Sequence, residues 1–473
     1  MTSISPNDAL HLAFQAAIDW IDGVDLRPVG ATASAAELRR RMQLALPRDG
    51  ISAERVIEDL IAMTRDGMHT SVSGRFFAWV IGGTLPSALA ADWLTSAWDQ
   101  NAAIYSTAPA AAVVEEVAGA WLLDLLDLPR DASFAFTTGC QLAHFTALAA
   151  ARHSVLSRAG WDADRDGLFG APPIRVITSE HRHGSIDRAI RFLGLGTSAL
   201  QALPTDRFGC LEARALVAAL ATTSGPTILV LNAADLNIGA FDDFATLIPI
   251  AKAAGAWVHI DGAFGLMARA STTKRALLNG VEGADSWATD AHKWLNVPQD
   301  CGFAVVRNRD AHRAAMTHTA SYISEHTDVR SQIDWNPEWS RRSRGFPVYA
   351  ALRELGRDGL ADLIDRTCAH CHAIVTGIGA LPGAALVWEP KLNQGLVRFF
   401  DRRPVATDAD HDQRTDAVID AINATGEAFF SGTTWQGRRA MRVSVVNWRT
   451  NAEDVRRTLA AVETVLARFE DRV

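Results

Sequence analysis

Four short apolar runs in the middle of the chain constrain its fold more than any other feature. They are IRVIT (174–178), TILVL (227–231), AWVHI (256–260) and GFAVV (302–306). Their hydrophobic residues are continuous rather than alternating, as in strands that are covered on both faces. Alanine-rich segments of helical character separate the runs, and strands that alternate with helices favour βαβ units. We therefore predict an α/β domain with a mostly parallel central sheet.

Two further regions flank this domain. Residues 1–75 have helical patterns, whereas the region after residue 350 begins with helical sequence and then changes to strands. The strand candidates of that region are ALVWE (385–389), LVRFF (396–400) and MRVSVV (441–446). We therefore predict a helical N-terminal arm of residues 1–75, a large domain of residues 76–350 and a smaller C-terminal α+β domain of residues 351–473.

Both ends of the chain are expected to be helical. In SAERVIEDLIAM, one face carries the apolar residues Val56, Ile57, Leu60 and Ile61 at helical spacing. The last helix is expected to begin with a capping box formed by Thr450 and Glu453.

Composition and charge exclude several classes of protein. The net charge is -8, and residues of both signs are spread along the chain, which argues against a nucleic-acid-binding surface. The start of the sequence lacks a basic region before an apolar run, and no long uncharged apolar stretch follows, so neither a signal peptide nor a transmembrane helix is expected. Five cysteines in 473 residues do not form a disulfide framework. We expect a cytoplasmic protein with reduced thiols.

Two residues point to a particular chemistry. The run AWVHI leads directly into Asp261, and ligands of open α/β sheets bind beyond the carboxyl ends of strands. Lys293 follows in DAHKWLNVPQDCG (290–302), at the start of an apolar segment. Pyridoxal 5'-phosphate (PLP) needs a lysine amine for a Schiff base and a carboxylate for its pyridine nitrogen. Burial is expected to lower the pKa of Lys293 and to free its amine as a nucleophile. A capped turn and a surface lysine remain the alternative for this pair alone.

Two other segments suit the same cofactor. FAFTTGCQLAHFTALAAARH (134–153) predicts a turn followed by a helix, whose first amides would bind a phosphate, and Gly139 permits a close backbone approach. ITSEHRHGSIDRAIRFLGLG (177–196) places His181 and His183 after another strand, where an imidazole would stack on a planar ring. Alone, the first segment is equally typical of an ordinary helix start and the second of a solvated loop.

The order of phosphate turn, histidine, aspartate and lysine resembles the group II PLP-dependent amino-acid decarboxylases of fold type I. This family includes aromatic-amino-acid, glutamate and diaminobutyrate decarboxylases. The resemblance extends from about residue 74 to residue 450, and its most specific motifs are VHIDGAFG and TDAHKWLNVPQDCG. It implies the PLP-dependent transferase fold and a homodimer whose active sites are shared between subunits.

The resemblance also implies roles for individual residues. Lys293 would form the Schiff base, Asp261 would pair with the pyridine nitrogen and Ala263 would lie under the ring. The pattern H-x-S-x-x-(K/R)-A aligns with His183 and makes it the ring-stacking histidine, with His181 as a neighbour. The other residues expected to hold the cofactor are Gly139, Cys140 and Gln141 at the phosphate turn, Asp290 and His292 beside the lysine, and Asp235 near the phenolic oxygen.

The implied reaction is decarboxylation of an L-amino acid to an amine and CO2. Many family members carry a tyrosine on the loop after the lysine, thought to protonate the carbanion, but that position falls near Gln332 here. Tyr322, His318 and His326 are other possible donors. Relatives altered at this position act as oxygen-dependent aldehyde synthases. An aldehyde synthase, a carbon–carbon lyase or aldolase, and a PLP-binding relative without turnover therefore remain alternatives.

The substrate is indicated only by the expected lining of the site. The resemblance implies an aromatic pocket formed by Phe77, Trp79, Tyr105 and Tyr322. No arginine in VIGGTLP is placed to bind a side-chain carboxylate, which disfavours glutamate and favours an aromatic or apolar amino acid.

Three sequence features depart from the pattern or compete with it. GCQLAHF replaces the commoner serine- and asparagine-bearing phosphate turn, although backbone amides still suit PLP. Asp235 is acidic where relatives are usually neutral, so we expect it to be protonated or turned away. CAHCH (368–372) matches the C-x-x-C-H pattern of haem attachment, but its surroundings have the pattern of an amphipathic helix, and we predict no metal site.

Overall fold

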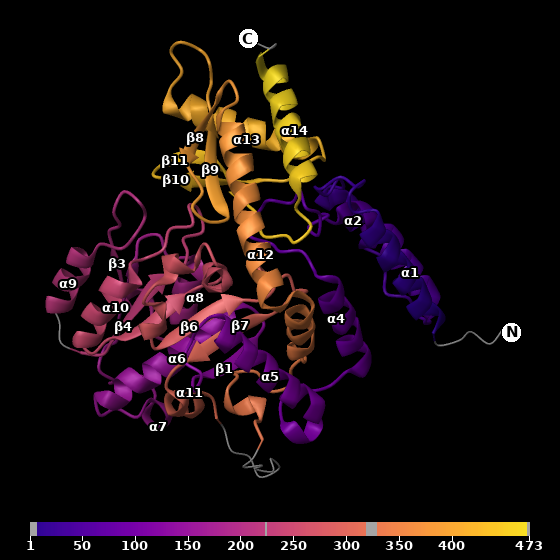
Figure 1. Ribbon diagram of the computed structural model, residues 1–473. Helices are drawn as coiled ribbons and strands as arrows, with labels where there is room; N and C mark the ends of the chain where they lie inside the picture. The colour runs from indigo at the N-terminus through magenta and orange to yellow at the C-terminus, as the bar shows by residue number, and fades with distance from the viewer. Residues whose placement is uncertain (1–6, 223–224, 318–328, 471–473) are drawn as a thin grey trace. The chain divides into compact units, whose positions relative to one another are not determined.

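The computed structural model describes residues 7–222, 225–317 and 329–470 (Figure 1). The chain forms two compact units. One contains residues 82–372 and 388–395, and the other contains residues 1–81, 373–387 and 396–473. Each unit is described by itself below.

The first unit is built on a seven-stranded sheet with the order β1-β7-β6-β5-β4-β2-β3. Its strands are β1 (Ser133–Thr137), β2 (Arg175–Ser179), β3 (Leu200–Leu203), β4 (Thr227–Asn232), β5 (Trp257–Asp261), β6 (Ser286–Asp290) and β7 (Gly302–Val306). Neighbouring strands from β3 to β6 are parallel, and β7 is antiparallel to both β6 and β1. The predicted mostly parallel sheet is therefore confirmed.

The four apolar runs form β2, β4, β5 and β7, as predicted. Every residue of β4, β5 and β7 is buried, which explains why their hydrophobic pattern does not alternate. The sequence analysis did not identify β1, β3 and β6 as strands. In β6, SWATD, all five residues are buried although three are polar, so its burial has no apolar signature.

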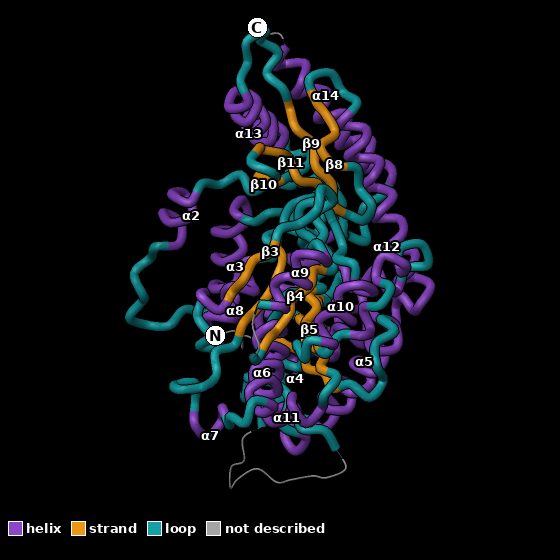
Figure 2. The backbone as a smooth tube through the Cα atoms, turned by 90° about the vertical axis from the view of Figure 1, so that its left-hand side faces the viewer, coloured by secondary structure: helices purple, strands orange, loops and turns teal. Residues whose placement is uncertain are grey.

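Helices cover the sheet. The helices of this unit are α4 (Pro86–Trp98), α5 (Pro109–Leu125), α6 (Cys140–Arg158), α7 (Ala163–Asp166), α8 (Gly184–Phe192), α9 (Ala213–Ala221), α10 (Phe244–Ala253), α11 (Arg309–Met316) and the first part of α12 (Gly345–Gly379). α6 packs against α8 and α11, while α10 packs against α9 and β5. In Figure 2 the strands lie between α8 on one side and α10 on the other. This is the layered arrangement expected of parallel strands joined by helices.

The second unit combines the two ends of the chain. It contains α1 (Asp8–Asp22), α2 (Ala35–Met42), α3 (Ala53–Thr64), α13 (Asp408–Ala424), α14 (Ala452–Glu470) and most of a sheet with the order β10-β11-β9-β8. The strands of this sheet are β8 (Ala384–Trp388), β9 (Gln394–Phe399), β10 (Ser431–Trp435) and β11 (Arg438–Ser444). Phe77 bonds to the backbone of Phe429 and of Ser444, so the segment after the helical arm runs into this C-terminal region.

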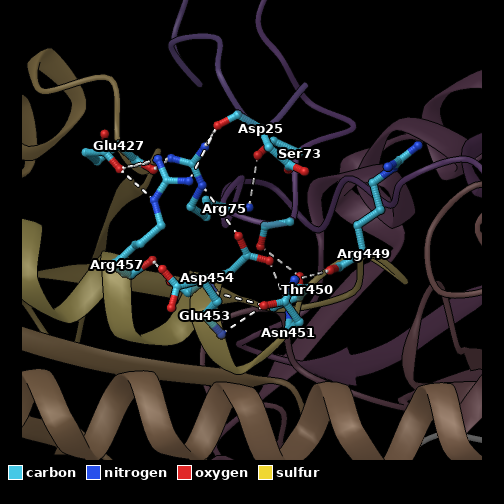
Figure 3. A network of polar contacts seen from close by, with 12 residues as sticks. Asp25, Ser73, Arg75, Glu427, Arg449, Thr450, Asn451, Glu453, Asp454 and Arg457 are labelled. Carbon is cyan, nitrogen blue, oxygen red and sulfur yellow. Dashed lines mark hydrogen bonds and ion pairs between the residues drawn. The ribbon is translucent and has the colours of Figure 1, made fainter. Parts of the chain in front are cut away.

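The start of α14 differs from the prediction by one residue. Asn451, not Thr450, caps the helix: its Oδ1 accepts the amides of Glu453 and Asp454 at 2.8 and 3.2 Å. Asp454 completes the box by accepting the Asn451 amide at 3.1 Å (Figure 3). The Thr450 hydroxyl instead donates to the carbonyl of Gly74 at 2.8 Å. The predicted box of Thr450 and Glu453 is therefore wrong, because Thr450 bonds outside its own helix.

A buried arginine joins distant segments of this unit. Arg75 is 1% exposed and donates to the Asp25 carbonyl at 3.0 Å. It also pairs with Glu427 Oε2 at 3.2 Å and with Asp454 Oδ1 at 3.5 Å (Figure 3). Because a buried guanidinium needs several acceptors, these contacts tie the N-terminal segment to the C-terminal one.

The sequence raised two questions, whether CAHCH (368–372) is a haem or metal site and whether a helix crosses a membrane. Cys368 and Cys371 of CAHCH are buried within α12, in keeping with helix packing. Among the residues that the structure describes, none of the helices combines the length and apolar character that a membrane crossing requires.

Candidate active site

One edge of the seven-stranded sheet gathers the predicted residues. The carboxyl ends of β1, β2, β4, β5 and β6 lead respectively to Gly139, His183, Asp235, Asp261 and Lys293. The antiparallel strand β7 begins at the same edge, where Gly302 pairs with both Thr137 and Asp290. The edge therefore collects four reactive or charged side chains and one glycine turn from the ends of five strands.

The predicted phosphate turn forms the start of α6. Gly139 precedes the helix with a φ of 123°, a conformation that residues with a Cβ rarely adopt. A Cβ on Gly302 would lie 2.3 Å from the carbonyl carbon of Gly139, so β7 and the turn approach each other closely. The amide of Cys140 donates to Asp290 Oδ1 at 2.6 Å. A helix N-terminus lined by glycine backbone suits an anion.

Lys293 lies in the loop between β6 and β7, where it forms an ion pair with Asp290. Its Nζ lies 3.0 Å from Asp290 Oδ2, and its side chain is 20% exposed. Burial by itself lowers the pKa of Lys293, but the carboxylate of Asp290, together with Cys140 and Asp261, outweighs burial, and the pKa lies above its ordinary value. The expectation that burial would free the amine is therefore wrong, because a carboxylate three residues away stabilises the ammonium form.

His292 has a defined tautomer. Its Nδ1 accepts the amide of Cys301 at 3.1 Å, so a neutral ring carries its proton on Nε2. The ring lies beside the phosphate turn, since a Cβ on Gly139 would be 3.4 Å from its Cε1.

Asp261 ends β5 as a buried carboxylate. Its Oδ1 lies 3.2 Å from the amide of Ala263 and 3.4 Å from Nε2 of His144. Its Oδ2 has no hydrogen-bond partner among the residues that the structure describes. Burial raises the pKa of Asp261, but His144, followed by His183 and Lys293, outweighs burial, and the pKa lies well below its usual range. The group is an ionised carboxylate with one oxygen available.

The loop after β2 connects to the phosphate turn. His183 is exposed and caps α8, where its Nδ1 accepts the amide of Ser185 at 3.2 Å. The Ser185 carbonyl in turn accepts from Nε2 of Gln141 at 3.3 Å. An exposed imidazole is thus held next to the turn that Gly139 begins.

Asp235 is a buried acid with one unsatisfied oxygen. Its Oδ1 accepts the amides of Asn237 and Ile238, both at 2.8 Å. Its Oδ2 has no partner in the described part of the chain. Burial raises the pKa of Asp235, which favours the protonated form that we expected for an acid at this position.

These groups fit PLP. The edge offers an amine, an ionised carboxylate with a free oxygen and a glycine-bearing helix start, which match the cofactor's aldehyde, pyridine nitrogen and phosphate. The family model described as the pyridoxal-dependent decarboxylase conserved domain matches residues 36–400.

The chain belongs to the pyridoxal-dependent decarboxylase family.

Individual relatives agree with this membership. L-2,4-diaminobutyrate decarboxylase of Rhizobium meliloti (strain 1021) is 31% identical in an alignment of 387 positions that covers 79% of this chain and 74% of that protein. Aromatic-L-amino-acid decarboxylase of Bacillus atrophaeus is 25% identical in an alignment of 477 positions that covers 98% of this chain and 96% of that protein. The solved structure of Oryza sativa TDC with PLP and tryptamine superposes with a TM-score of 0.91 at 22% identity, covering 99% of both chains. The predicted fold type I is confirmed.

This pyridoxal-dependent decarboxylase is therefore a carboxy-lyase that acts on an amino acid with PLP as cofactor. The resemblance found in the sequence is confirmed for family, fold, enzyme class and cofactor. The roles of individual residues stay predictions.

The residues predicted to line the substrate pocket of the decarboxylase are distributed over the chain. Tyr105 is partly buried in the first unit, where its amide lies 3.4 Å from Oγ of Ser331. Phe77 is buried against Phe430 in the second unit, and Trp79 is 50% exposed there. Tyr322 lies outside the described residues, as do the alternative donors His318 and His326. A shared aromatic pocket stays a prediction.

Gln332 lies near the position where the sequence resemblance predicts the loop tyrosine of many family members. It is 1% exposed, and its Oε1 accepts from Nε of Arg330 at 3.2 Å. A buried amide held in this way is a poor candidate for a proton donor to substrate.

Sequence reasoning missed three residues at the decarboxylase site. Gly82 lies against the lysine loop, since a Cβ there would be 2.0 Å from the Lys293 carbonyl oxygen. His144 and His259 are fully buried behind Asp261. His259 had a signal, because it precedes Asp261 by two residues and so shares its face of β5. His144 had none, because it reaches Asp261 from α6 across the packing of helix and sheet.

Proposed function

We propose that this enzyme decarboxylates an L-amino acid with an aromatic or apolar side chain, giving the amine and CO2, with PLP covalently attached to Lys293. The observation that carries the proposal is that an amine and a carboxylate with a free oxygen come to the same edge of the sheet. Lys293 Nζ lies at the same sheet edge as Asp261, close enough to lower the pKa of that carboxyl. Bound PLP supplies the electron sink for the electrons that the leaving CO2 abandons.

Other residues of the chain would bind the ring nitrogen and the phosphate. Asp261 Oδ2 would accept a hydrogen bond from the protonated ring nitrogen, and its negative charge would keep that nitrogen protonated. The amide of Gln141, near the start of α6, and Nε2–H of His292 would donate to the phosphate. Asp290 accepts the Cys140 amide and so holds the turn in place, whereas a carboxylate in direct contact with the phosphate would be repelled.

Three further residues shape the ring pocket. His183 would stack on one face of the ring, and Ala263 would lie under the other. The protonated carboxyl of Asp235 would donate to the phenolic oxygen, which would give its unsatisfied Oδ2 a partner. Gly139 keeps the phosphate turn close to β7.

The lysine assignment is tested by trapping. Borohydride reduction of the wild-type holoenzyme should fix PLP to the peptide that contains Lys293, as measured by mass spectrometry. Lys293→Ala should lose the fixed cofactor and the visible absorbance that depends on it. Lys252→Ala is the matched control, because Lys252 also pairs with a buried aspartate, Asp285, and should leave trapping unchanged. Equal trapping in Lys293→Ala would refute the assignment.

A second reaction is favoured by the burial of Gln332. Without a tyrosine there, an aldehyde synthase would consume amino acid, O2 and H2O and release aldehyde, CO2, NH3 and H2O2. Anaerobic and aerobic assays on a panel of aromatic, apolar and acidic amino acids separate the two reactions. Amine and CO2 without peroxide support decarboxylation. Aldehyde, ammonia and peroxide in equal amounts with CO2 support the synthase.

We infer a homodimer in which the N-terminal arm joins the subunits. None of the residues that the structure describes in α1, α2 and α3 is buried. Several of their apolar side chains are more than 40% exposed, including Leu10, Phe14, Val56 and Leu60. An exposed apolar surface of this kind is typical of an interface. Light scattering should show a dimer for the wild type and a lower mass for Leu10→Glu combined with Leu60→Glu. An unchanged mass would exclude the arm.

A further inference from the structure

A line of buried polar side chains lies behind Asp261. Nε1 of Trp257 donates to Oγ of Ser286 at 2.9 Å, and Oγ of Ser286 is 2.9 Å from Nδ1 of His259. Nε2 of His259 is 2.9 Å from Nδ1 of His144, whose Nε2 lies 3.4 Å from Asp261 Oδ1. Each of these five side chains is at most 8% exposed. The line therefore runs without solvent from an indole to the carboxylate.

The register of the sheet fixes this line. Trp257, His259 and Asp261 alternate along β5 and so point to the same face. Ser286 begins the neighbouring strand β6, where it stands directly opposite His259. His144 comes from the second turn of α6, which packs on β5 and β6. Three elements thus set the distances, rather than one flexible loop.

The available protons fix which group donates and which accepts at each step of this line of hydrogen bonds. An indole N–H only donates, so the oxygen of Ser286 is an acceptor toward Trp257. Within the described ranges, the hydroxyl proton of Ser286 then has a single acceptor, Nδ1 of His259. A neutral His259 must therefore carry its proton on Nε2 and donate to Nδ1 of His144. By the same logic His144 carries its proton on Nε2, the nitrogen that faces Asp261.

The surroundings of His259 favour a neutral ring. Burial, followed by the neighbouring His144, holds the pKa of His259 well below its usual value. Sγ of Cys140 lies 3.3 Å from Nε2 of His144, and burial raises the pKa of that thiol well above its usual value. Cys140 is therefore a neutral neighbour, and a thiol is a weaker acceptor than the carboxylate of Asp261.

We propose that Ser286, His259 and His144 form a tautomer relay that directs Nε2–H of His144 at Asp261 Oδ1 and so holds Oδ2 toward the cofactor. His144 is then a positioning residue for the reaction. If the relay ran the other way, His144 would present a lone pair to the carboxylate and repel it. The inference rests on the proposed role of Asp261 toward the ring nitrogen, but the tautomers themselves are a property of the chain without cofactor.

The first experiment measures these tautomers in the apoprotein. Histidine-selective 15N labelling and long-range 1H–15N spectra should show His144 and His259 as neutral Nε2–H tautomers, with signals assigned from His144→Gln and His259→Gln. Ser286→Ala removes the hydroxyl that fixes His259 and should shift both signals. Ser133→Ala is the matched control, because its hydroxyl lies 2.8 Å from another buried histidine, His312, in the same unit. It should leave the signals of His144 and His259 unchanged.

Two results would overturn the relay. The first is an Nδ1–H or cationic His144 in the wild type, or a pair of signals that Ser286→Ala does not move. The second is stoichiometric zinc in the purified chain that Cys140→Ser removes. Cys140, His144 and Asp261 lie close enough to hold a metal, and a metal would need the lone pair of Nε2 in place of its proton.

The second experiment measures PLP affinity by equilibrium binding. His144→Phe and Ser286→Ala should each raise the dissociation constant about tenfold, since they remove or misdirect a hydrogen bond to a charged group. His144→Gln, which keeps an N–H donor, should recover most of the affinity, and Ser133→Ala should bind as the wild type does. Wild-type affinity in His144→Phe would refute the positioning role. Wild-type affinity in Asp261→Asn would instead refute the proposed function, whatever the tautomers show.

Discussion

Asp290 favours the protonated form of Lys293, the amine that we propose as the attachment point of PLP. Lys293 Nζ and Asp290 Oδ2 are 3.0 Å apart, and the pair raises the pKa of the lysine although burial opposes it. An ammonium group does not attack an aldehyde, so the amine has to lose its proton first. If Lys293 is the attachment point that we propose, Asp290 holds its amine in the protonated, unreactive form until PLP binds.

We predict that Asp290→Asn shifts the pH dependence of PLP attachment. Removing the carboxylate lowers the pKa of Lys293, so the neutral amine appears at lower pH. The midpoint of the rate of PLP attachment to apoprotein should move toward lower pH, as measured by stopped-flow absorbance. Asp300 lies on the same loop as Lys293 but pairs with Arg344 instead. Asp300→Asn should therefore leave the midpoint unchanged. A midpoint that does not move would show that Asp290 does not set the pKa.

His312 makes the stability of its unit depend on pH. It is fully buried, and burial, with Arg330 as a second cause, lowers its pKa from 6.5 to about 3. The unfolded chain therefore binds a proton between pH 6.5 and pH 3 that the folded chain does not, and the stability from this group is lost as the pH falls.

We predict that His312→Gln flattens this dependence. Gln keeps a donor for the carbonyl of Trp335 but does not titrate. Between pH 6 and pH 4 the free energy of unfolding of the wild type should fall relative to the variant by about 1.4 kcal/mol per pH unit. Urea unfolding followed by tryptophan fluorescence measures it, and parallel profiles would contradict the assignment.

At the scale of elements, the elements that can be predicted are those whose structure depends mainly on their own residues. The strands β2, β4, β5 and β7 were predicted because their own residues are apolar. β6 was not, because Ser286, Thr289 and Asp290 are polar, and their burial follows from its central place in the sheet. The cap of α14 was displaced for a similar reason, since Gly74, far away in sequence, takes the Thr450 hydroxyl.

The cap of α14 provides a prediction at this scale. Asn451→Ala should lower the free energy of unfolding by about 1 kcal/mol, because two first-turn amides lose their acceptor. Asn451→Ser should restore most of it. Glu453→Ala should have a clearly smaller effect, because the side chain of Glu453 pairs with Arg456 at the surface. If chemical unfolding shows a larger effect for Glu453→Ala than for Asn451→Ala, the capping box predicted from the sequence, with Glu453 as its acidic member, would be supported instead.

At the scale of the whole molecule, local motifs explain where the candidate residues meet, whereas they do not explain how the two ends of the chain are grouped. Lys293, Asp261 and His183 each follow a strand or a recognisable motif, so topology alone brings them to one edge. The grouping of residues 1–81 with residues 396–473 has no local signal. It depends on contacts such as those of Arg75, whose partners Asp25, Glu427 and Asp454 span most of the chain.

Arg75 supplies the corresponding prediction. Arg75→Met should lower the free energy of unfolding by about 3 kcal/mol, because it leaves the buried carboxylate of Asp454 without its cation. Arg457→Met is the control: Arg457 pairs with the same Glu427 at 2.7 Å but is 30% exposed, so its loss should cost less than about 1 kcal/mol. Equal losses for the two variants, measured by urea unfolding, would show that burial does not distinguish them.

The antiparallel strand β7 has a consequence for the order of folding. Because β6 and β7 are consecutive in the chain, with Asp290 opposite Gly302, Lys293 lies in the loop of a hairpin. Hairpins close quickly, whereas parallel neighbours must wait for a long crossover. The phosphate turn joins this hairpin only when β1 pairs with β7, bringing Thr137 to Gly302 across the intervening sequence. We expect the lysine half of the site to form early in folding and the phosphate half to form late, so that the chain becomes able to hold its cofactor only when the sheet is nearly finished.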